Sequence, residues 1–454
     1  MYRSLCLAIA LLVCGSPIIA DSTAPITLDI SSVSKMAIER NLGIKTAEKD
    51  LDSARHQVRE AESYRHGKAG LSATYLHFDD DILTKSPAIT FPPSVPLLGG
   101  LSFTPPAVKI APQELVHLTL EAGYPLYTGK KIEYAISQAR NAVVAREALV
   151  EDTKASAILE AERYYLGVLL AKHVVDVHQQ ALDSYKEHLN HARIAYDKGF
   201  VAQYDVIRAE TAVKEQEKRL TEARNTLDLT VAALRTSLDL DSNTPLDIRG
   251  SLFEPTEPLT FEQSRDLAMK NSRVLKALDA KLDAQRMAQK VEESGRKSQV
   301  PVVAKQELLT GNIAQTDPHW LIGVQASLEL YDGGVRKARI EQHRSEIERT
   351  VIDRQSAADQ IELAIRNCYL ELDSARSALE LARKSEQLAE ESLRLAMKRF
   401  EVGTGTSLEV LDANVSLAAA RVGEYQCLYR LDMAYLQLHR YLNDISTVVL
   451  EVGK

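Results

Sequence analysis

Short segments in which apolar and polar residues alternate occur in pairs along the chain. The clearest alternates His117, Thr119 and Glu121 with the apolar residues Val116, Leu118, Leu120 and Ala122. A period of two residues is typical of a β-strand with one polar and one apolar face. We therefore predict four strands, at about residues 70–78, 115–127, 299–309 and 319–331. Segments of about ten residues have the length of a membrane-crossing strand.

A period of alternating four- and three-residue steps marks the segment near the C-terminus. One ladder consists of Leu411, Val415, Ala418, Val422, Tyr425 and Tyr429, and a second of Leu428, Leu431, Tyr435 and Leu438. Such steps place apolar residues on one seam of a helix. Two overlapping seams indicate neighbours on both sides, as in a wall of helices. We predict helices over about 407–442 and over the corresponding earlier segment, about 204–240.

Each of these two segments follows a stretch almost free of helix-breaking residues. No proline occurs between Pro125 and Pro245, and none after Pro318. Because proline and glycine usually interrupt helices, we predict long helices over about 130–198 and 334–402. At ~1.5 Å per residue, each would be a rod of about 100 Å.

The two halves of the chain repeat each other. Tyr127 and Gly129 match Tyr331 and Gly333 at an offset of 204 residues, and no gap is needed over the following helices. Further upstream the offset is 231 residues. So long a period indicates duplication of one large unit rather than a solenoid. We predict a first repeat over 21–250 and a second over 251–454, each with a helix, two strands, a long helix, a tight turn and a return helix.

The N-terminal twenty residues have the pattern of a secretory signal peptide. Arg3 precedes an apolar stretch, and Ala20 is a small residue before a plausible cleavage point. Lipidation of Cys14 is the alternative, although Val13 is larger than the residue that normally precedes a lipidated cysteine. We therefore expect residues 1–20 to be removed on export.

Charge and composition narrow the function. The net charge is −8 and no basic stripe is present, so we expect no nucleic acid among the partners. Phosphate-binding loops, nucleophile elbows and zinc-protease motifs are absent from the sequence, and we expect neither an enzyme, a metal nor a cofactor.

A membrane-crossing part would have to use the strands, because no run of eighteen apolar residues follows the signal. Four strands cannot close a barrel, and open sheet edges are not tolerated in lipid. Three copies would supply twelve strands and twelve helical columns. The alternative is a soluble coiled-coil protein with a small β-domain, which would leave the alternating strands without a purpose.

Four boundary motifs make a family resemblance specific. They are Tyr-Pro-Leu-Tyr-Thr-Gly (124–129), Arg-Ile-Ala-Tyr-Asp-Lys-Gly (193–199), Leu-Glu-Leu-Tyr-Asp-Gly-Gly (328–334) and Arg-Phe-Glu-Val-Gly-Thr-Gly-Thr-Ser-Leu-Glu-Val-Leu-Asp-Ala (399–413). With the duplication, the chain resembles the TolC-like outer-membrane efflux proteins over nearly its whole length.

The resemblance implies a fold that is mainly α with membrane β-strands. It implies a homotrimer whose 12-stranded β-barrel in outer-membrane lipid continues into a periplasmic α-helical barrel. It further implies a passive exit duct for efflux or type I secretion, opened by a periplasmic adaptor (membrane fusion protein) and an inner-membrane transporter of the RND, ABC or MFS class. A periplasmic scaffold or adaptor without a pore is the alternative.

The tight turns are the candidate functional region. Gly199, Gly403 and Gly405 would form the periplasmic tips, where the adaptor docks. Glu409 and Asp412 share one helix face, and in a trimer they would form carboxylate rings that favour cations. The resemblance places such acids at the aperture. The alternatives are a capping box over 406–409 for Glu409 and a solvated face for Asp412.

The resemblance also assigns Asp205, which matches Glu409 in the first repeat, to a network that closes the mouth. TolC has an arginine at the position of Gly405 and a tyrosine at that of Phe400, so the closing contacts of this chain should differ. His188 and His191 lie three residues apart on a predicted helix. A solvated face is the favoured interpretation there, and a metal pair the alternative.

The remaining candidate residues lie near the strands. The junctions between strand and long helix contain Tyr127, Gly129, Tyr331, Asp332, Gly333 and Gly334. Trp320, the only tryptophan, begins a predicted strand, where an aromatic residue at the membrane interface would lie.

Overall fold

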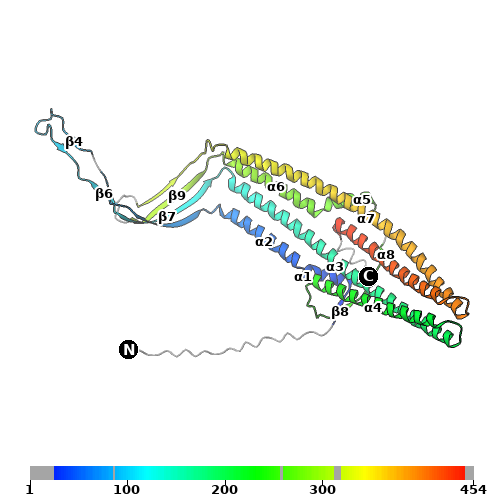
Figure 1. Cartoon of the computed structure of the whole chain (residues 1–454). Coiled ribbons are helices and arrows are strands. Elements are labelled where there is room, and N and C mark those ends of the chain that lie inside the picture. The colour runs from blue at the N-terminus through cyan, green and yellow to red at the C-terminus, as the bar shows by residue number, and fades with distance from the viewer. Residues whose placement is uncertain (1–24, 85–86, 256–258, 311–318, 445–454) are drawn as a thin grey trace, which may run out of the picture.

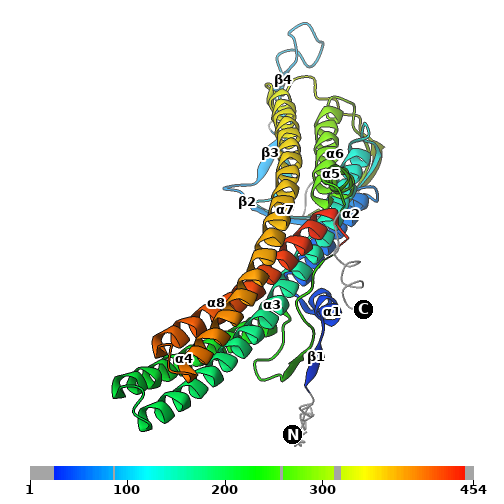
Figure 2. The same cartoon turned by 90° about the vertical axis from the view of Figure 1, so that its right-hand side faces the viewer.

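The computed structural model describes residues 25–84, 87–255, 259–310 and 319–444, so the expected signal peptide lies outside the described residues. The described chain is elongated (Figure 1). Strands lie at one end, and long helices run from them to two turns at the other end. The short elements β1, β8 and α1 lie beside the middle of the helices (Figures 1 and 2).

The elements follow the same order in both halves. The first half contains β1 (Ile26–Leu28), α1 (Ile30–Arg40), α2 (Leu42–Ser63), β2 (Lys68–His77), β3 (Ile82–Thr84), β4 (Ile89–Thr90), β5 (Ser102–Phe103), β6 (Val108–Ala111), β7 (Glu114–Tyr127), α3 (Lys131–Asp197), α4 (Gln203–Ser237) and β8 (Leu246–Ile248). The second contains α5 (Phe261–Asn271), α6 (Arg273–Ser294), β9 (Val300–Thr310), β10 (Trp320–Val324), α7 (Val335–Glu401) and α8 (Ser407–Leu442).

Corresponding helices have matching lengths. The long helices α3 and α7 have 67 residues each. The pair α1 and α5 has 11 residues each, and the pair α2 and α6 has 22 each. The chain therefore builds two copies of one supersecondary unit.

The long helices form a curved wall (Figure 2). Near the strands, α2 packs on α3, α3 on α6 and α6 on α7. Near the turns, α4 packs on α3, α3 on α8 and α8 on α7. Among the described elements, α3 packs against α2 and α6 near the strands and against α4 and α8 near the turns, whereas α7 packs against α6, α5 and α8. No helix among the described residues combines the length and apolar character needed to cross a membrane.

The main hydrophobic core lies in the middle of the wall. It joins residues from β1, α1, α3, α7 and α8, with Leu166, Ile365 and Leu438 fully buried. The second predicted ladder contributes Leu431, Tyr435 and Leu438 to this core. In the first ladder Leu411 is buried but Val415 is exposed, so that seam is only partly covered within one chain.

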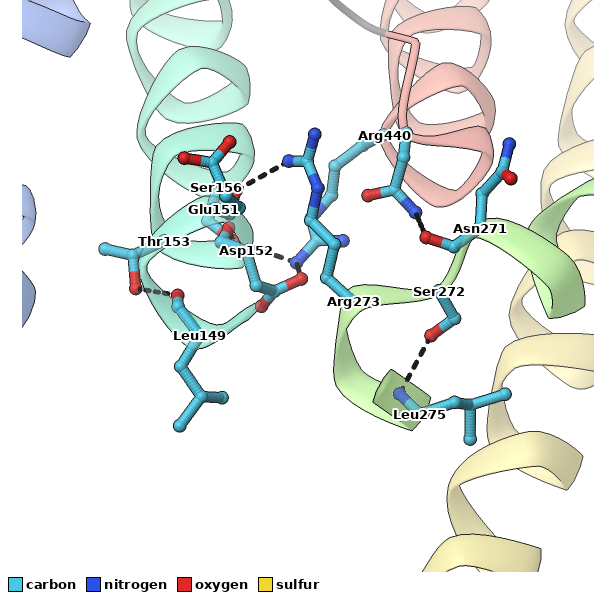
Figure 3. A network of polar contacts seen from close by, with 11 residues as sticks. Leu149, Glu151, Asp152, Thr153, Ser156, Asn271, Ser272, Arg273, Leu275 and Arg440 are labelled. Atoms are coloured by element: carbon cyan, nitrogen blue, oxygen red, sulfur yellow. Dashed lines mark hydrogen bonds and ion pairs between the residues drawn. The ribbon is translucent and has the colours of Figure 1, made fainter. Parts of the chain in front are cut away.

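Polar contacts also join the two halves in this region (Figure 3). Arg440 of α8 donates from Nη2 to Asp152 Oδ1 at 2.8 Å and to Ser156 Oγ at 3.0 Å, both on α3. Arg273, the first residue of α6, donates to the carbonyl of Glu151 at 2.6 Å. Since charge-assisted hydrogen bonds are among the stronger ones, these contacts hold the second half against α3.

Four strands form an antiparallel sheet in the order β10-β9-β7-β2. Strand β10 ends at Val324, earlier than the expected range of 319–331. Gln325 still donates to the carbonyl of Pro301 at 3.1 Å, but proline has no N–H with which to return the bond. Only an isolated bridge between Gln299 and Ser327 continues the pairing. The outer strands of the sheet are β2 and β10.

The proline-rich segment between β2 and β7 contains regular strand pairing. β3 pairs with β6 and β4 pairs with β5, both antiparallel. The prolines of the segment all lie outside these four strands, which is why the composition concealed them. The segment extends well beyond the sheet (Figure 1). We call its described residues, 82–84 and 87–111, the arm.

Candidate functional site: the two helical tips

Both tight turns reverse the chain at a glycine. Gly199 has φ +74° and Gly403 has φ +77°, the left-handed region in which glycine carries no steric cost. A Cβ at either position would meet no atom within 4 Å, so the conformation and not crowding requires glycine. The turns are tightened by bonds from Phe200 N to Ala195 O at 2.9 Å and from Thr404 N to Arg399 O at 2.8 Å.

Gly405 has a different reason to be glycine. A Cβ there would lie 2.9 Å from Arg399 Cβ and 3.0 Å from Phe400 N. Gly405 N also donates to Arg399 O at 2.8 Å. The turn therefore passes so close to the end of α7 that no side chain fits at 405 without movement of the backbone. An arginine at this position would require a different turn.

The first tip is capped by its carboxylate. Asp205 folds back and accepts a hydrogen bond from Ala202 N at 3.3 Å, at the beginning of α4. A carboxylate there satisfies one of the amides that a helix start leaves unpaired, and it lies near the positive end of the helix dipole. In a single chain, Asp205 thus serves its own turn.

The second tip divides the roles differently. Thr406 Oγ1 accepts from Glu409 N at 3.3 Å, which is one half of the expected capping box. The other half is missing, because the Glu409 carboxylate lies 3.2 Å from Arg399 Nη1 at the end of α7. The charged partner of Glu409 therefore comes from position 399.

Asp412 lies one turn further along α8 and is exposed. It lines a groove of about 430 Å³ between α4 and α8, over Tyr185 of α3. Arg208 and Arg219 of α4 line the same groove. The predicted acidic pair therefore lies in a mixed electrostatic environment within one chain.

The prediction that His188 lies on a solvated face is wrong. His188 is 1% exposed, and its Nε2 lies 2.8 Å from Ser407 Oγ at the start of α8. Its ring meets that of Phe400 edge to face, with centroids 4.8 Å apart. Burial lowers the pKa of His188 to about 4, so the ring is neutral at pH 7.

His191, one turn along α3, also contacts the second tip. Its Nδ1 lies 3.6 Å from Glu401 Oε1. A small apolar cluster surrounds this contact region and includes Ala192, Leu393 and Val410. Sequence reasoning missed the histidine interface because the helical period of α3 alone did not reveal which face the other hairpin covers.

The family of this chain follows from its sequence. The family described as outer membrane efflux protein matches residues 94–239 and 265–444, which is more than half of the chain and includes both tips. The chain belongs to the outer membrane efflux protein family. The resemblance inferred from the boundary motifs is confirmed.

Individual relatives are distant. The outer membrane efflux protein BepC of Brucella suis is 23% identical over 66% of this chain and 66% of its own length. The alkaline protease secretion protein AprF of Pseudomonas aeruginosa is 22% identical over 65% of this chain and 62% of its own. The chain thus matches slightly less than two thirds of these relatives' lengths. The outer membrane protein VceC of Vibrio cholerae shares the fold, with a TM-score of 0.71, 16% identity, and coverage of 91% of this chain and 96% of VceC.

The long helices of this efflux-family chain begin differently at the two strand–helix junctions. At the second junction Asp332 accepts from Gly334 N at 3.0 Å and from Arg336 N at 2.9 Å, and so caps α7. Gly333 and Gly334 both have positive φ. Tyr331 is 86% exposed, so its side chain is not packed inside the junction.

At the first junction the turn approaches another element. Gly129 has φ +61°, and a Cβ there would lie 2.6 Å from Lys297 Cβ beyond the end of α6. Lys130 follows in the same left-handed region, and Tyr127 is about half exposed. Trp320, at the start of β10, is 61% exposed. Gly129 and Lys130 shape the junction. The relation of Trp320 to a membrane stays a prediction.

Two buried carboxylates escaped the sequence analysis. Glu162 of α3 accepts from Ser34 Oγ at 2.8 Å, and Asp432 of α8 accepts from Phe253 N at 3.2 Å. Both are fully buried, and burial raises the pKa of each to about 8. Each has a second oxygen without a hydrogen-bond partner among the described residues. A protonated carboxyl matches this environment better than a charged one.

Proposed function

We propose that this chain is the outer-membrane exit duct of an efflux or type I secretion system and works as a trimer. The observation that carries the proposal is that one chain leaves two edges uncovered, one along helix α7 and one at the outer strands of the sheet. Family membership and the shared fold support the duct. A scaffold or adaptor without a pore would not need uncovered edges on both its sheet and its helices.

The first unfinished edge is a stripe of exposed leucines and one isoleucine along α7. Side chains at steps of seven and eleven residues are exposed, namely Ile352, Leu363, Leu370, Leu381, Leu388 and Leu395. Such steps keep them within about 20° of one line along the helix. Large apolar side chains exposed along one line of a helix indicate a protein interface.

The second unfinished edge is that of the sheet. Among the described strands, β2 and β10 each have a paired neighbour on one side only. The faces differ in chemistry, since Val116 and Leu120 are exposed on one face while Thr119 is buried on the other. Three sheets joined β2 to β10 would make twelve strands, with the apolar face toward outer-membrane lipid and Trp320 near its interface. The helices would extend into the periplasm.

The tips would form the periplasmic mouth and meet a periplasmic adaptor. Phe200 and Val402 stand at the two turns with 77% and 73% exposure. Apolar side chains at the end of a rod are available to a partner protein. Glu409 and Asp412 would face the aperture, with Asp205 holding the first tip. The energy source would be an inner-membrane transporter that the adaptor recruits.

Oligomer mass in detergent tests the proposal. We expect Leu388→Asp to break the trimer, because it buries a charge in the interface. Gln387→Asp is the matched control, since the neighbouring side chain points about 100° away. The purified wild-type protein should also conduct ions in planar bilayers. A monomer that is recovered only in the soluble periplasm would overturn the proposal.

A further inference from the structure

The arm carries a surface that nothing in the duct function explains. No charged residue occurs between Lys85 and Lys109, and the stretch contains apolar side chains throughout. Leu97, at the apex, is 99% exposed, and Leu101 and Phe103 are both 56% exposed. Soluble surfaces seldom display so many large apolar side chains together, and such a patch indicates a binding partner.

The apex has an ordered structure, although the described residues of one chain leave Leu97 exposed. Thr90 Oγ1 and Ser102 Oγ lie 3.3 Å apart across the β4–β5 pair, and Phe91 N donates to Leu101 O at 3.0 Å. Leu97 has φ +68°, which is unfavourable for a leucine. A two-stranded ribbon without a further layer is only marginally stable in water. Exposure of the apex and strain at Leu97 would both be offset if a partner covered this residue.

We infer that the arms of the three copies pack on one another through their apices, with Leu97 at the contact. The inference rests on the proposed trimer. The arm grows out of β2 and β7, and β2 is an edge strand of the sheet. In a closed trimer each arm therefore rises beside the junction with the next copy. The same contact would place the three apices across the outer end of the duct.

Charge distinguishes this occupant from a lipid surface. A contact around a rotation axis brings each residue close to its own copies, so any charge there would repel itself. The apex has none, whereas the base of the arm has the ion pair between Lys109 Nζ and Asp81 Oδ2 at 2.6 Å. Segments that bind anionic membrane surfaces use Lys or Arg on their polar face, and residues 87–108 contain neither.

Cysteine cross-linking in the full-length protein tests the inference. Ser94→Cys places an exposed thiol near the apex, and Asp80→Cys places one at the base of the arm. With a short bifunctional maleimide, Ser94→Cys should give a cross-linked pair of chains in most trimers, and Asp80→Cys should give few. The chain with its native cysteines alone controls for background.

A second substitution then tests Leu97 itself. Adding Leu97→Asp to Ser94→Cys should lower the cross-linked fraction at least about tenfold, because three like charges would meet on the axis. Leu83→Asp at the base should leave the fraction unchanged. Intact trimers that do not cross-link at 94, or that bind neutral phospholipid vesicles through the apex, overturn the inference but not the duct. Absence of a trimer would overturn the proposed duct itself.

Discussion

The two tips of this chain have the same backbone plan and different chemistry. Each joins a 67-residue helix to a return helix through a glycine with positive φ. Yet the first tip is capped by the carboxylate of Asp205, and the second by the hydroxyl of Thr406. Glu409, the counterpart of Asp205, is thereby free to pair with Arg399. The two repeats therefore share the same turn, but Asp205 caps its helix whereas Glu409 forms an ion pair.

The largest difference concerns the aromatic residue before each turn. Phe400 is 7% exposed and packs on His188, whereas its counterpart Tyr196 is 43% exposed. We expect Phe400→Ala to cost about 3 kcal/mol of local stability, because it opens a cavity between the hairpins. Tyr196→Ala should cost under about 1 kcal/mol, as is usual for exposed positions. Hydrogen exchange at the ends of α3 and α7 measures both, and equal losses would contradict the comparison.

The third residue of each turn gives a smaller effect. The first repeat has Val201 where the second has Gly405. Gly405→Val should destabilise the second tip by about 1–3 kcal/mol, since its Cβ would meet the end of α7. Val201→Gly should cost less, because it only frees the backbone and loses a half-buried side chain. Thermal unfolding of the two variants ranks them. A neutral Gly405→Val would show that the close approach is dispensable.

His188 makes the stability of the second tip depend on pH. The residue that matches His188 in the other repeat is Ser392, which does not titrate in this range. The pKa of His188 is about 4 in the folded chain and about 6.5 unfolded, so folding favours the neutral ring. The stabilisation is complete above pH 6.5 and is lost as the pH falls from 6.5 toward 4.

Three further groups lie near His188, namely His191, Asp205 and Ser407. Of these, Asp205 partly opposes the lowering of the pKa of His188. Exchange protection of the tip should therefore fall between pH 6.5 and 4. His188→Gln should flatten that part of the profile. His191→Gln is the matched control, and an unchanged profile in His188→Gln would assign the effect to another group.

The sequence predicted the long helices better than the contacts at the tips. Long helices could be recognised because the absence of proline over more than a hundred residues leaves few alternatives. The pairing of β3 with β6 could not be recognised, because strands of only three and four residues give too weak a pattern in a proline-rich segment. The contact between His188 and Ser407 joins positions 219 residues apart. Helical period alone does not say which face of α3 the second hairpin covers.

The acids of the second tip give the smallest effect on stability and the most specific one on transport. Arg399 and Glu409 are both substantially exposed, so Glu409→Ala should change the free energy of unfolding by less than about 1 kcal/mol. In the proposed trimer, Glu409→Ala with Asp412→Ala should nonetheless reduce the cation selectivity of the duct, because carboxylates near a pore mouth attract cations. Reversal potentials in a salt gradient measure this.

Asp205→Ala provides the matched comparison. Asp205 is already engaged with its own helix start, so its loss should weaken the cap by about 1 kcal/mol and leave the reversal potential almost unchanged. Arg399→Ala separates two further possibilities, because it releases Glu409 without removing its charge. If the pair with Arg399 neutralises the mouth, Arg399→Ala should raise cation selectivity. If the double alanine variant and the wild type show the same reversal potential, Glu409 and Asp412 do not line the conducting path. The pairing of Glu409 with Arg399 would then affect only the stability of the second tip.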